Sequence, residues 1–160
     1  MPLIYSINEP EYREKMASFD YDWTMVKPKG KRKFPKDKGD WEFLFKSVPT
    51  KLKEYYTKGY MIVLFTNQSK AWKIEQIHNV IEQLEIPIYL VVAYSKHKRG
   101  YKPDKGMFTH FIKDNTIDKD NSFFVGDALG REGDWADSDK QFAINIGIPY
   151  YSPEEIFKES

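Results

Sequence analysis

Two carboxylates spaced two residues apart, Asp20 and Asp22, follow a short apolar run at residues 16–19 and precede Thr24. In an extended segment, residues two apart point to the same side, so both acids can face one pocket at the end of a strand. Two carboxylates that share a site repel each other unless a cation or a shared proton joins them. The spacing therefore suggests a divalent metal, a shared proton or both, although Asp also commonly ends a strand in a turn.

A strongly basic stretch follows the two acids, at residues 25–40. Its prolines and glycines are typical of an exposed loop, and they predict a flap that carries a hairpin. Before Asp40, seven cations stand against one acid, and they are Lys27, Lys29, Lys31, Arg32, Lys33, Lys36 and Lys38. Such a run is usually a solvated face, but beside a site that can handle phosphate it also fits a groove for nucleic acid.

Short apolar runs alternate with segments of helical periodicity along the chain. After a polar lead at residues 3–15, which could be an extended arm or a short helix, strands are expected at residues 16–19, 60–65, 88–94, 122–125 and 142–146. Helices are expected at about 49–58, 72–84 and 103–111, and after Ser152, which begins a capping box. This alternation predicts an α/β fold, a Rossmann-like three-layer αβα sandwich with a central parallel sheet.

The binding site of such a sheet lies beyond the carboxyl ends of its strands. Asp20 and Asp22, Thr66, and Asp127 each come directly after a predicted strand, so three separate segments bring polar groups to one edge. Lys102 precedes a predicted helix and can reach the same edge. The common placement of these residues, more than any one of them, indicates a site there.

The composition fits one domain, residues 1–160, with 41% hydrophobic and 16% aromatic residues. The 25 basic and 24 acidic residues nearly cancel, so the overall charge points to no polyanionic partner. The absence of cysteine excludes disulfides and thiolate zinc sites. We see neither a secretion signal nor an apolar run of about 20 residues, so an intracellular, soluble protein with no membrane partner is expected.

The motifs resemble those of the haloacid dehalogenase superfamily of phosphotransferases. The matching residues are Asp20-Tyr21-Asp22-Trp23-Thr24, then Thr66, Lys102, and Gly126-Asp127 with Asp139 downstream. A closer resemblance is to the 3′-phosphatase domain of polynucleotide kinase-phosphatase, and it covers about residues 19–157. It rests on Phe34-Pro35, Asp40-Trp41, Phe65-Thr66-Asn67-Gln68, Lys102-Pro103, Phe124-Val125-Gly126-Asp127-Ala128 and Gly130-Arg131.

This resemblance implies a role for each site residue. Asp20 would be the nucleophile that forms an aspartyl-phosphate, and Asp22 the general acid and then base. Thr66 and Lys102 would bind the phosphoryl oxygens. Mg²⁺ would be held by Asp20, by Asp22 through its backbone carbonyl, and by Asp127, with Asp139 and Asn67 supporting these residues. The expected substrate-binding residues are Trp23, Lys29, Lys31, Arg32, Lys33, Arg99 and Arg131.

The sequence therefore predicts a Mg²⁺-dependent polynucleotide 3′-phosphatase that acts on 3′-phosphate ends of nucleic acid. The nucleic acid is expected to be DNA, and the process is expected to be end repair. The protein is expected to be a monomer without a large cap domain. No Gly-x-x-x-x-Gly-Lys-Ser/Thr loop occurs, so no kinase domain is expected in this chain. Two alternatives stay open. One is an uncapped phosphatase that acts on a sugar phosphate or other small phosphate ester. The other is a non-catalytic nucleic-acid end-binding module, in which Trp23, where the family usually has Gly, blocks the pocket.

Overall fold

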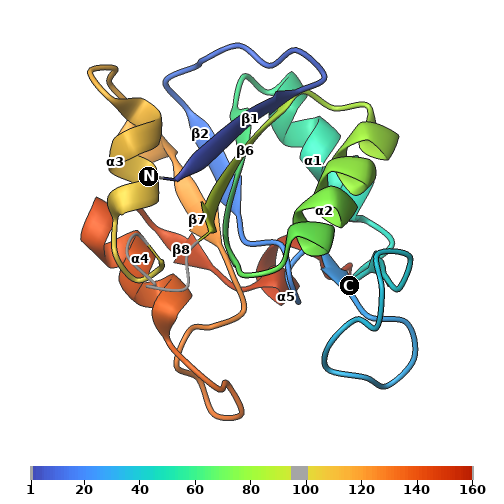
Figure 1. Ribbon diagram of the computed structural model, residues 1–160. Coiled ribbons are helices and arrows are strands. Elements are labelled where there is room, and N and C mark those ends of the chain that lie inside the picture. Colours follow the sequence, from blue (N-terminus) through green and yellow to red (C-terminus); the bar gives the residue numbers. More distant parts are fainter. Residues whose placement is uncertain (1, 95–100, 160) are drawn as a thin grey trace.

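A six-stranded sheet lies at the centre of the computed structural model, which describes residues 2–94 and 101–159 (Figure 1). Its strands, in sheet order, are β1 (Leu3–Ile7), β6 (Ile88–Tyr94), β5 (Met61–Gln68), β2 (Met16–Phe19), β7 (Phe123–Val125) and β8 (Tyr150–Tyr151). All neighbours pair in parallel except β1, which runs antiparallel to β6. The predicted α/β fold is confirmed, with one antiparallel strand added at the edge.

Helices cover both faces of this sheet. The α-helices are α1 (Val48–Thr57), α2 (Ala71–Leu84), α3 (Gly106–Ile112), α4 (Ser138–Ile146) and α5 (Pro153–Phe157). Helices α1, α2 and α5 pack on one face, whereas α3 and α4 pack on the other (Figure 1). Side chains of β5 alternate between the two, because Ile62 and Leu64 join the first core and Val63 and Phe65 join the second. The strand is therefore buried on both faces, as a three-layer sandwich requires.

The sequence-based strand at residues 142–146 is wrong, because these residues form the second half of α4. Phe142, Ala143 and Ile146 are buried against the sheet at helical spacing. The apolar run is too short to separate a strand from a buried helix segment by periodicity alone. The last strand is instead β8, and the polar lead contributes β1.

The basic flap, residues 25–40, is framed by a small hairpin of β3 (Val26–Lys27) and β4 (Glu42–Phe43). A hairpin is therefore present as predicted, but it lies at the base of the flap, since β4 follows residue 40. Across the described ranges, no separate cap domain stands between the strands, since the flap and α1 fill the connection from β2 to β5. Within residues 2–94 and 101–159, every helix is too short or too polar to cross a lipid bilayer.

Candidate active site

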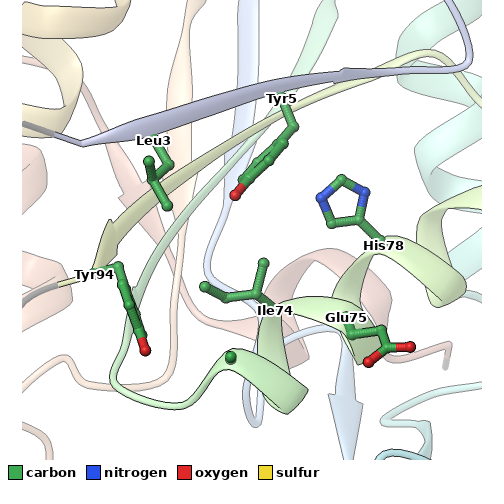
Figure 2. Close-up of a pocket in the computed structure, with 7 residues that line it drawn as sticks. Leu3, Tyr5, Ile74, Glu75, His78 and Tyr94 are labelled. Atoms are coloured by element: carbon green, nitrogen blue, oxygen red, sulfur yellow. The ribbon is translucent and has the colours of Figure 1, made fainter.

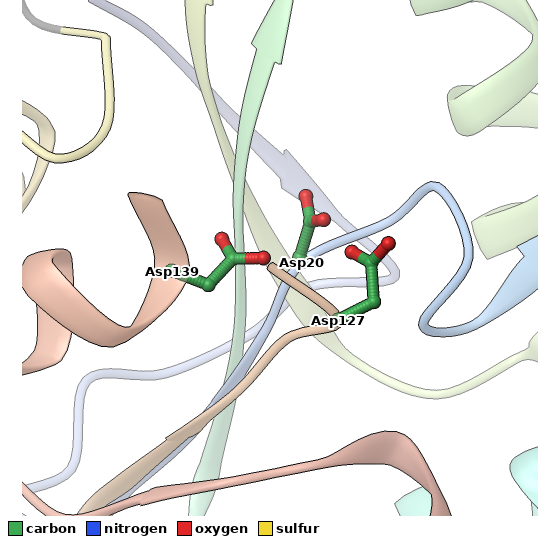
Figure 3. A group of neighbouring side chains, drawn as sticks. All are labelled: Asp20, Asp127 and Asp139. Atoms are coloured by element: carbon green, nitrogen blue, oxygen red, sulfur yellow. The ribbon is translucent and has the colours of Figure 1, made fainter. Parts of the chain in front are cut away.

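Three carboxylates meet at the carboxyl edge of the sheet (Figure 3). Asp20 follows β2, Asp127 follows β7 after a single glycine, and Asp139 lies in the first turn of α4. One oxygen of each lies within 4.8 Å of one of each of the others. The backbone N–H of Asp20 donates to the Val125 carbonyl at 2.8 Å, which extends the β2–β7 pairing up to the acids. The sheet itself therefore brings Asp20 and Asp127 together.

Gly126 makes room for the third acid. A Cβ at this position would lie 2.5 Å from the carboxylate of Asp139, closer than side chains can approach. Asp139 also accepts from the backbone N–H of Ala128 at 3.0 Å. The Gly126-Asp127 pair of the fourth motif thus serves two purposes, because the glycine admits Asp139 and the aspartate joins the cluster.

Lys102 is the cation of this cluster. Its buried Nζ lies 2.9 Å from Asp20 and 2.8 Å from Asp139. The side-chain oxygen of Asn67 accepts from the backbone N–H of Lys102 at 2.9 Å, which fixes the segment that carries the lysine. Burial alone would lower the pKa of Lys102, but the carboxylates of Asp139 and Asp20 outweigh it and raise the pKa. Lys102 is therefore held as a cation, and Asn67 positions it.

One lysine does not balance three carboxylates. Burial raises the pKa of Asp20 well above its usual value; Lys102 opposes this, and Asp139 and Asp127 add to it. Burial and then the charge of Asp139 raise the pKa of Asp127 to about 6. Both oxygens of Asp139 already accept hydrogen bonds, from Lys102 and Ala128. The carboxylates of Asp20 and Asp127 are therefore the ones that fit a hard divalent cation, and the backbone carbonyl of Asp22 as its ligand stays a prediction.

Asp22 faces a different set of partners, which the sequence did not reveal. Lys73, in the first turn of α2, forms an ion pair with its Oδ1. The amide of Gln68 donates to its Oδ2 at 3.0 Å and to Thr66 Oγ1 at 2.8 Å. Gln68 belongs to a segment that carries the resemblance, and it lies two residues from Thr66 on the same side of β5. Lys73 carries no such signal.

The basic flap is organised by the buried carboxylate of Asp40. Arg32 binds both of its oxygens, at 2.8 and 3.2 Å, and the backbone N–H groups of Lys29 and Lys36 donate to it at 3.0 and 2.9 Å. These bonds, from Arg32 first and then from Lys36, lower the pKa of Asp40 to about 2. Arg32 therefore has a structural partner, besides any role in binding substrate.

Three other predicted flap residues, Lys29, Lys31 and Lys33, are exposed, and we call them the flap lysines. Within the described part of the chain, none of them forms an ion pair. Arg131 is held by Asp134 and Glu154, and it donates to the Asp127 carbonyl at 3.2 Å, so it lies beside the acids. Arg99, also predicted to bind substrate, lies outside the described residues.

Trp23 is not a core residue, and its ring contacts the flap. Its side chain is partly exposed, and its ring N–H donates to the Lys33 carbonyl of the flap at 3.0 Å. Its φ of 58° lies in the left-handed region, which favours glycine. The tryptophan thus connects the turn that carries Asp22 to the flap.

A hollow of about 440 Å³ lies between β1, β6 and α2 (Figure 2). Its walls are mainly apolar, and they are formed by Leu3, Tyr5, Ala71, Ile74, Glu75, His78 and Tyr94. The acids of the cluster are not among these residues. The candidate site is therefore identified by the charged side chains that converge there and not by the size of a cavity.

The profile of a family described as polynucleotide kinase 3 phosphatase matches residues 15–157. The chain belongs to this family. It is 40% identical to a bifunctional polynucleotide phosphatase/kinase of Schizosaccharomyces pombe, over 90% of this chain and 38% of that protein. It is 33% identical to the polynucleotide 3′-phosphatase ZDP of Arabidopsis thaliana, over 90% of this chain and 24% of that protein. The chain thus spans less than half the length of these two relatives.

Two further matches extend the comparison. An uncharacterized 20.8 kDa protein of Autographa californica nuclear polyhedrosis virus is 37% identical, over 96% of this chain and 91% of that one. A solved D,D-heptose 1.7-bisphosphate phosphatase from B. bronchiseptica, complexed with magnesium and phosphate, aligns with a TM-score of 0.61 at 20% identity, over 84% of this chain and 78% of that one. The latter supports the fold alone. Together these matches confirm the predicted haloacid dehalogenase-like fold and the assignment to a phosphatase family.

Proposed function

We propose that this protein is a Mg²⁺-dependent polynucleotide 3′-phosphatase that removes 3′-phosphates from DNA ends during repair. The observation that carries the proposal is the setting of Asp20, a carboxylate at the end of β2 with a buried lysine 2.9 Å away and two further acids around it. The names of the related S. pombe and A. thaliana proteins support a polynucleotide as the substrate. The roles of individual residues are part of the proposal.

In the first displacement, a carboxylate oxygen of Asp20 attacks phosphorus. A bond forms between this oxygen and phosphorus, the bond to the 3′-oxygen breaks, and the leaving oxygen takes a proton from Asp22. Negative charge on the phosphoryl oxygens is met by Lys102 and the hydroxyl of Thr66. Both lie at the same sheet edge as Asp20, as this step requires.

In the second displacement, a water attacks the aspartyl-phosphate. Asp22, now ionised, accepts a proton from this water, the bond between Asp20 and phosphorus breaks, and inorganic phosphate leaves. The carboxylate of Asp20 and the protonated Asp22 are regenerated, so the cycle closes with no further reactant than water. One carboxylate can serve both steps because it gains in the second the proton that it gave up in the first.

Magnesium fits the site because burial and then the charge of Asp139 raise the pKa of both Asp20 and Asp127. These two carboxylates would hold the ion. When bound, Mg²⁺ supplies positive charge against the phosphoryl oxygens. Asp139, which already accepts from Lys102 and Ala128, orients the lysine instead.

The flap offers a path for the nucleic-acid strand. The three flap lysines are exposed beside the site, and the bonds to Asp40 and Trp23 hold the loop that presents them. Lysines arranged in this way bind phosphates of any sequence, and they make binding depend on salt. Phe34, also on the flap, is 80% exposed and offers an aromatic surface to a base.

A phosphate-release assay tests the proposal. The substrates are a 3′-phosphorylated oligodeoxynucleotide, its 5′-phosphorylated isomer, the matching RNA and a panel of sugar phosphates, each with Mg²⁺ and with excess chelator. We expect Mg²⁺-dependent release from the 3′-phosphorylated DNA at a rate well above that from all others. Equal or faster release from the 5′-isomer or from a sugar phosphate would contradict the proposal.

The sugar-phosphate panel also tests the second candidate, a phosphatase for small phosphate esters. One observation favours it, a D-glycero-beta-D-manno-heptose-1,7-bisphosphate 7-phosphatase of Haemophilus ducreyi that is 30% identical over 56% of this chain. The exposed flap lysines argue for the longer substrate. For a non-catalytic end-binding module, the cluster of Asp20, Lys102 and Asp127 would serve no purpose, and the ring N–H of Trp23 is bonded to the flap.

A further inference from the structure

Both carboxylate oxygens of Asp22 are engaged by side chains to which the sequence assigned no role. Lys73 pairs with Oδ1, and Gln68 donates to Oδ2 at 3.0 Å. The backbone of Asp22 is fixed as well, because the next turn closes on the Tyr21 carbonyl, which accepts the N–H groups of Met25 and Val26. The Asp22 side chain can still rotate, and the contacts to Lys73 and Gln68 fix its orientation.

Lys73 is an unusual lysine in its surroundings. Only 7% of the residue is exposed, although lysine is rarely buried without a partner. Asp22 is the only hydrogen-bond or ion-pair partner of its ammonium group within the described residues. The lysine also occupies the first turn of α2, where the helix dipole already disfavours a cation. Burial and helix position both oppose a lysine here, so the ion pair with Asp22 accounts for its placement.

Gln68 connects the same carboxylate to the phosphate-binding hydroxyl. Its amide donates to Thr66 Oγ1 at 2.8 Å as well as to Asp22, so these two groups keep a fixed separation. Tyr101 in turn donates to the backbone carbonyl of Gln68 at 2.7 Å. The donor network therefore ties the acid to a group that must meet the same phosphate.

We propose that Lys73 is a positioning residue for proton transfer by Asp22. It holds the carboxylate in the orientation, relative to Thr66, from which the proton reaches the leaving oxygen. Lys73 itself contacts neither phosphorus nor the leaving oxygen. This inference rests on the phosphatase chemistry proposed above, and it assigns a function to the first turn of α2, which carries none of the motifs.

The proposal predicts a loss that depends on the leaving group. An alkoxide such as a 3′-oxygen leaves only with a proton, whereas p-nitrophenolate leaves without one. General acid catalysis contributes about 10²–10⁴ to such a step, and an acid that is present but misplaced should lose part of this. For Lys73→Met we expect a loss of about tenfold to a hundredfold on a 3′-phosphorylated oligonucleotide.

The measurement is single-turnover cleavage in Mg²⁺, since this reports the first displacement alone. With p-nitrophenyl phosphate, Lys73→Met should change the rate by less than about threefold, and KM for the oligonucleotide should also stay within about threefold. Lys73→Arg should restore much of the oligonucleotide rate, because a guanidinium also binds a carboxylate. If Lys73→Met does not fold, Lys73→Gln takes its place.

Two controls isolate the contact with Asp22. In an Asp22→Asn background, Lys73→Met should have less than about a twofold further effect, because residues that act through one another are not additive. Lys70→Met removes a lysine from the same end of α2, one that is exposed and lies over the Trp72 ring. It should leave both rates unchanged, which separates the ion pair from the general charge of this surface.

Several results would overturn the proposal. They are an unchanged oligonucleotide rate, an equal loss on both substrates, a raised KM with kcat unchanged, an undiminished effect in the Asp22→Asn background, and the same loss in Lys70→Met. Failure of the proposed substrate is a separate result, in which the parent protein releases phosphate from another alkyl phosphate but not from the oligonucleotide. That alkyl phosphate then replaces the oligonucleotide in the same comparison.

Discussion

Replacing Lys102 with methionine should destabilise the metal-free protein by about 3–5 kcal/mol. The lysine Nζ lies 2.9 Å from Asp20 and 2.8 Å from Asp139, and the three side chains are only 3%, 13% and 2% exposed. Methionine fills a similar volume but leaves both carboxylates without a cation, and breaking a buried pair in this way costs about 3–5 kcal/mol. For a chain of this size, 1 kcal/mol corresponds to about 2–4 °C, so Tm should fall by about 6–20 °C.

The loss should depend on pH in a defined direction. Burial already raises the pKa of Asp20, and without Lys102 its pKa rises further. A carboxyl whose pKa is raised on folding contributes stability that is present below its unfolded pKa, about 3.9, and that is lost as pH rises through the folded value. The variant should therefore lie closest to the parent near pH 4 and furthest from it above neutrality.

Urea denaturation and thermal melts at pH 4 and pH 7.5, in excess chelator, measure both effects. Lys73→Met is the matched control, since its partner Asp22 is 38% exposed and the loss should stay within about 1 kcal/mol. Adding Asp139→Asn to Lys102→Met should recover part of the stability, because it removes one uncompensated charge. A loss below about 1 kcal/mol for Lys102→Met, or one that is equal at both pH values, would refute the argument.

Four further predictions concern activity. Asp20→Asn should abolish turnover while the protein stays folded, because an amide is a poor nucleophile, and near-normal phosphate release would contradict the covalent mechanism. Asp127→Ala should raise the Mg²⁺ concentration for half-maximal rate, and full activity of the parent protein in excess chelator would count against the metal site. Replacing the three flap lysines with glutamine should reduce the slope of log affinity against log salt by about 2 for single-stranded nucleic acid. Turnover of p-nitrophenyl phosphate should stay unchanged, and equal losses in both assays would assign the flap to the active site itself. Trp23→Gly should raise KM for oligonucleotides about tenfold at similar Tm, since glycine suits the backbone but loses the bond to the flap; an unchanged KM would show that this bond does not affect binding.

The residues at strand ends could be predicted from the sequence because the parallel sheet fixes where they meet. Asp20, Thr66 and Asp127 each follow an apolar run, and pairing of β2 with β5 and β7 brings them to one edge. The positions of Lys102 and Asp139 followed from the resemblance, since a lysine before a helix and an aspartate within one carry no periodic signal. In the structure, the buried Lys102 ammonium lies between the carboxylates of Asp20 and Asp139, so each charge offsets the burial of the other.

The partners of Asp22 could not be predicted, for a physical reason. The distance from Lys73 to Asp22 depends on how the connection between β5 and α2 sets the first turn of the helix, and sequence spacing does not specify that geometry. The prediction of a strand at residues 142–146 was wrong for another reason, since a five-residue apolar run fits both a strand and one side of a helix. In both cases the sequence lacked the information on how a helix packs against the rest of the fold.

Trp23 shows how the catalytic turn and the flap depend on each other. A tryptophan at a φ of 58° costs about 1–2 kcal/mol relative to glycine, which the resemblance implies at this position. In return, its ring N–H binds the Lys33 carbonyl, and the flap is further tied down by Asp40, which binds Arg32. A nucleic-acid strand that displaces the flap would therefore also displace Trp23, the residue next to Asp22. Because Lys73 holds the carboxylate of Asp22 from the other side, the position of the acid depends on α2 as well as on the flap.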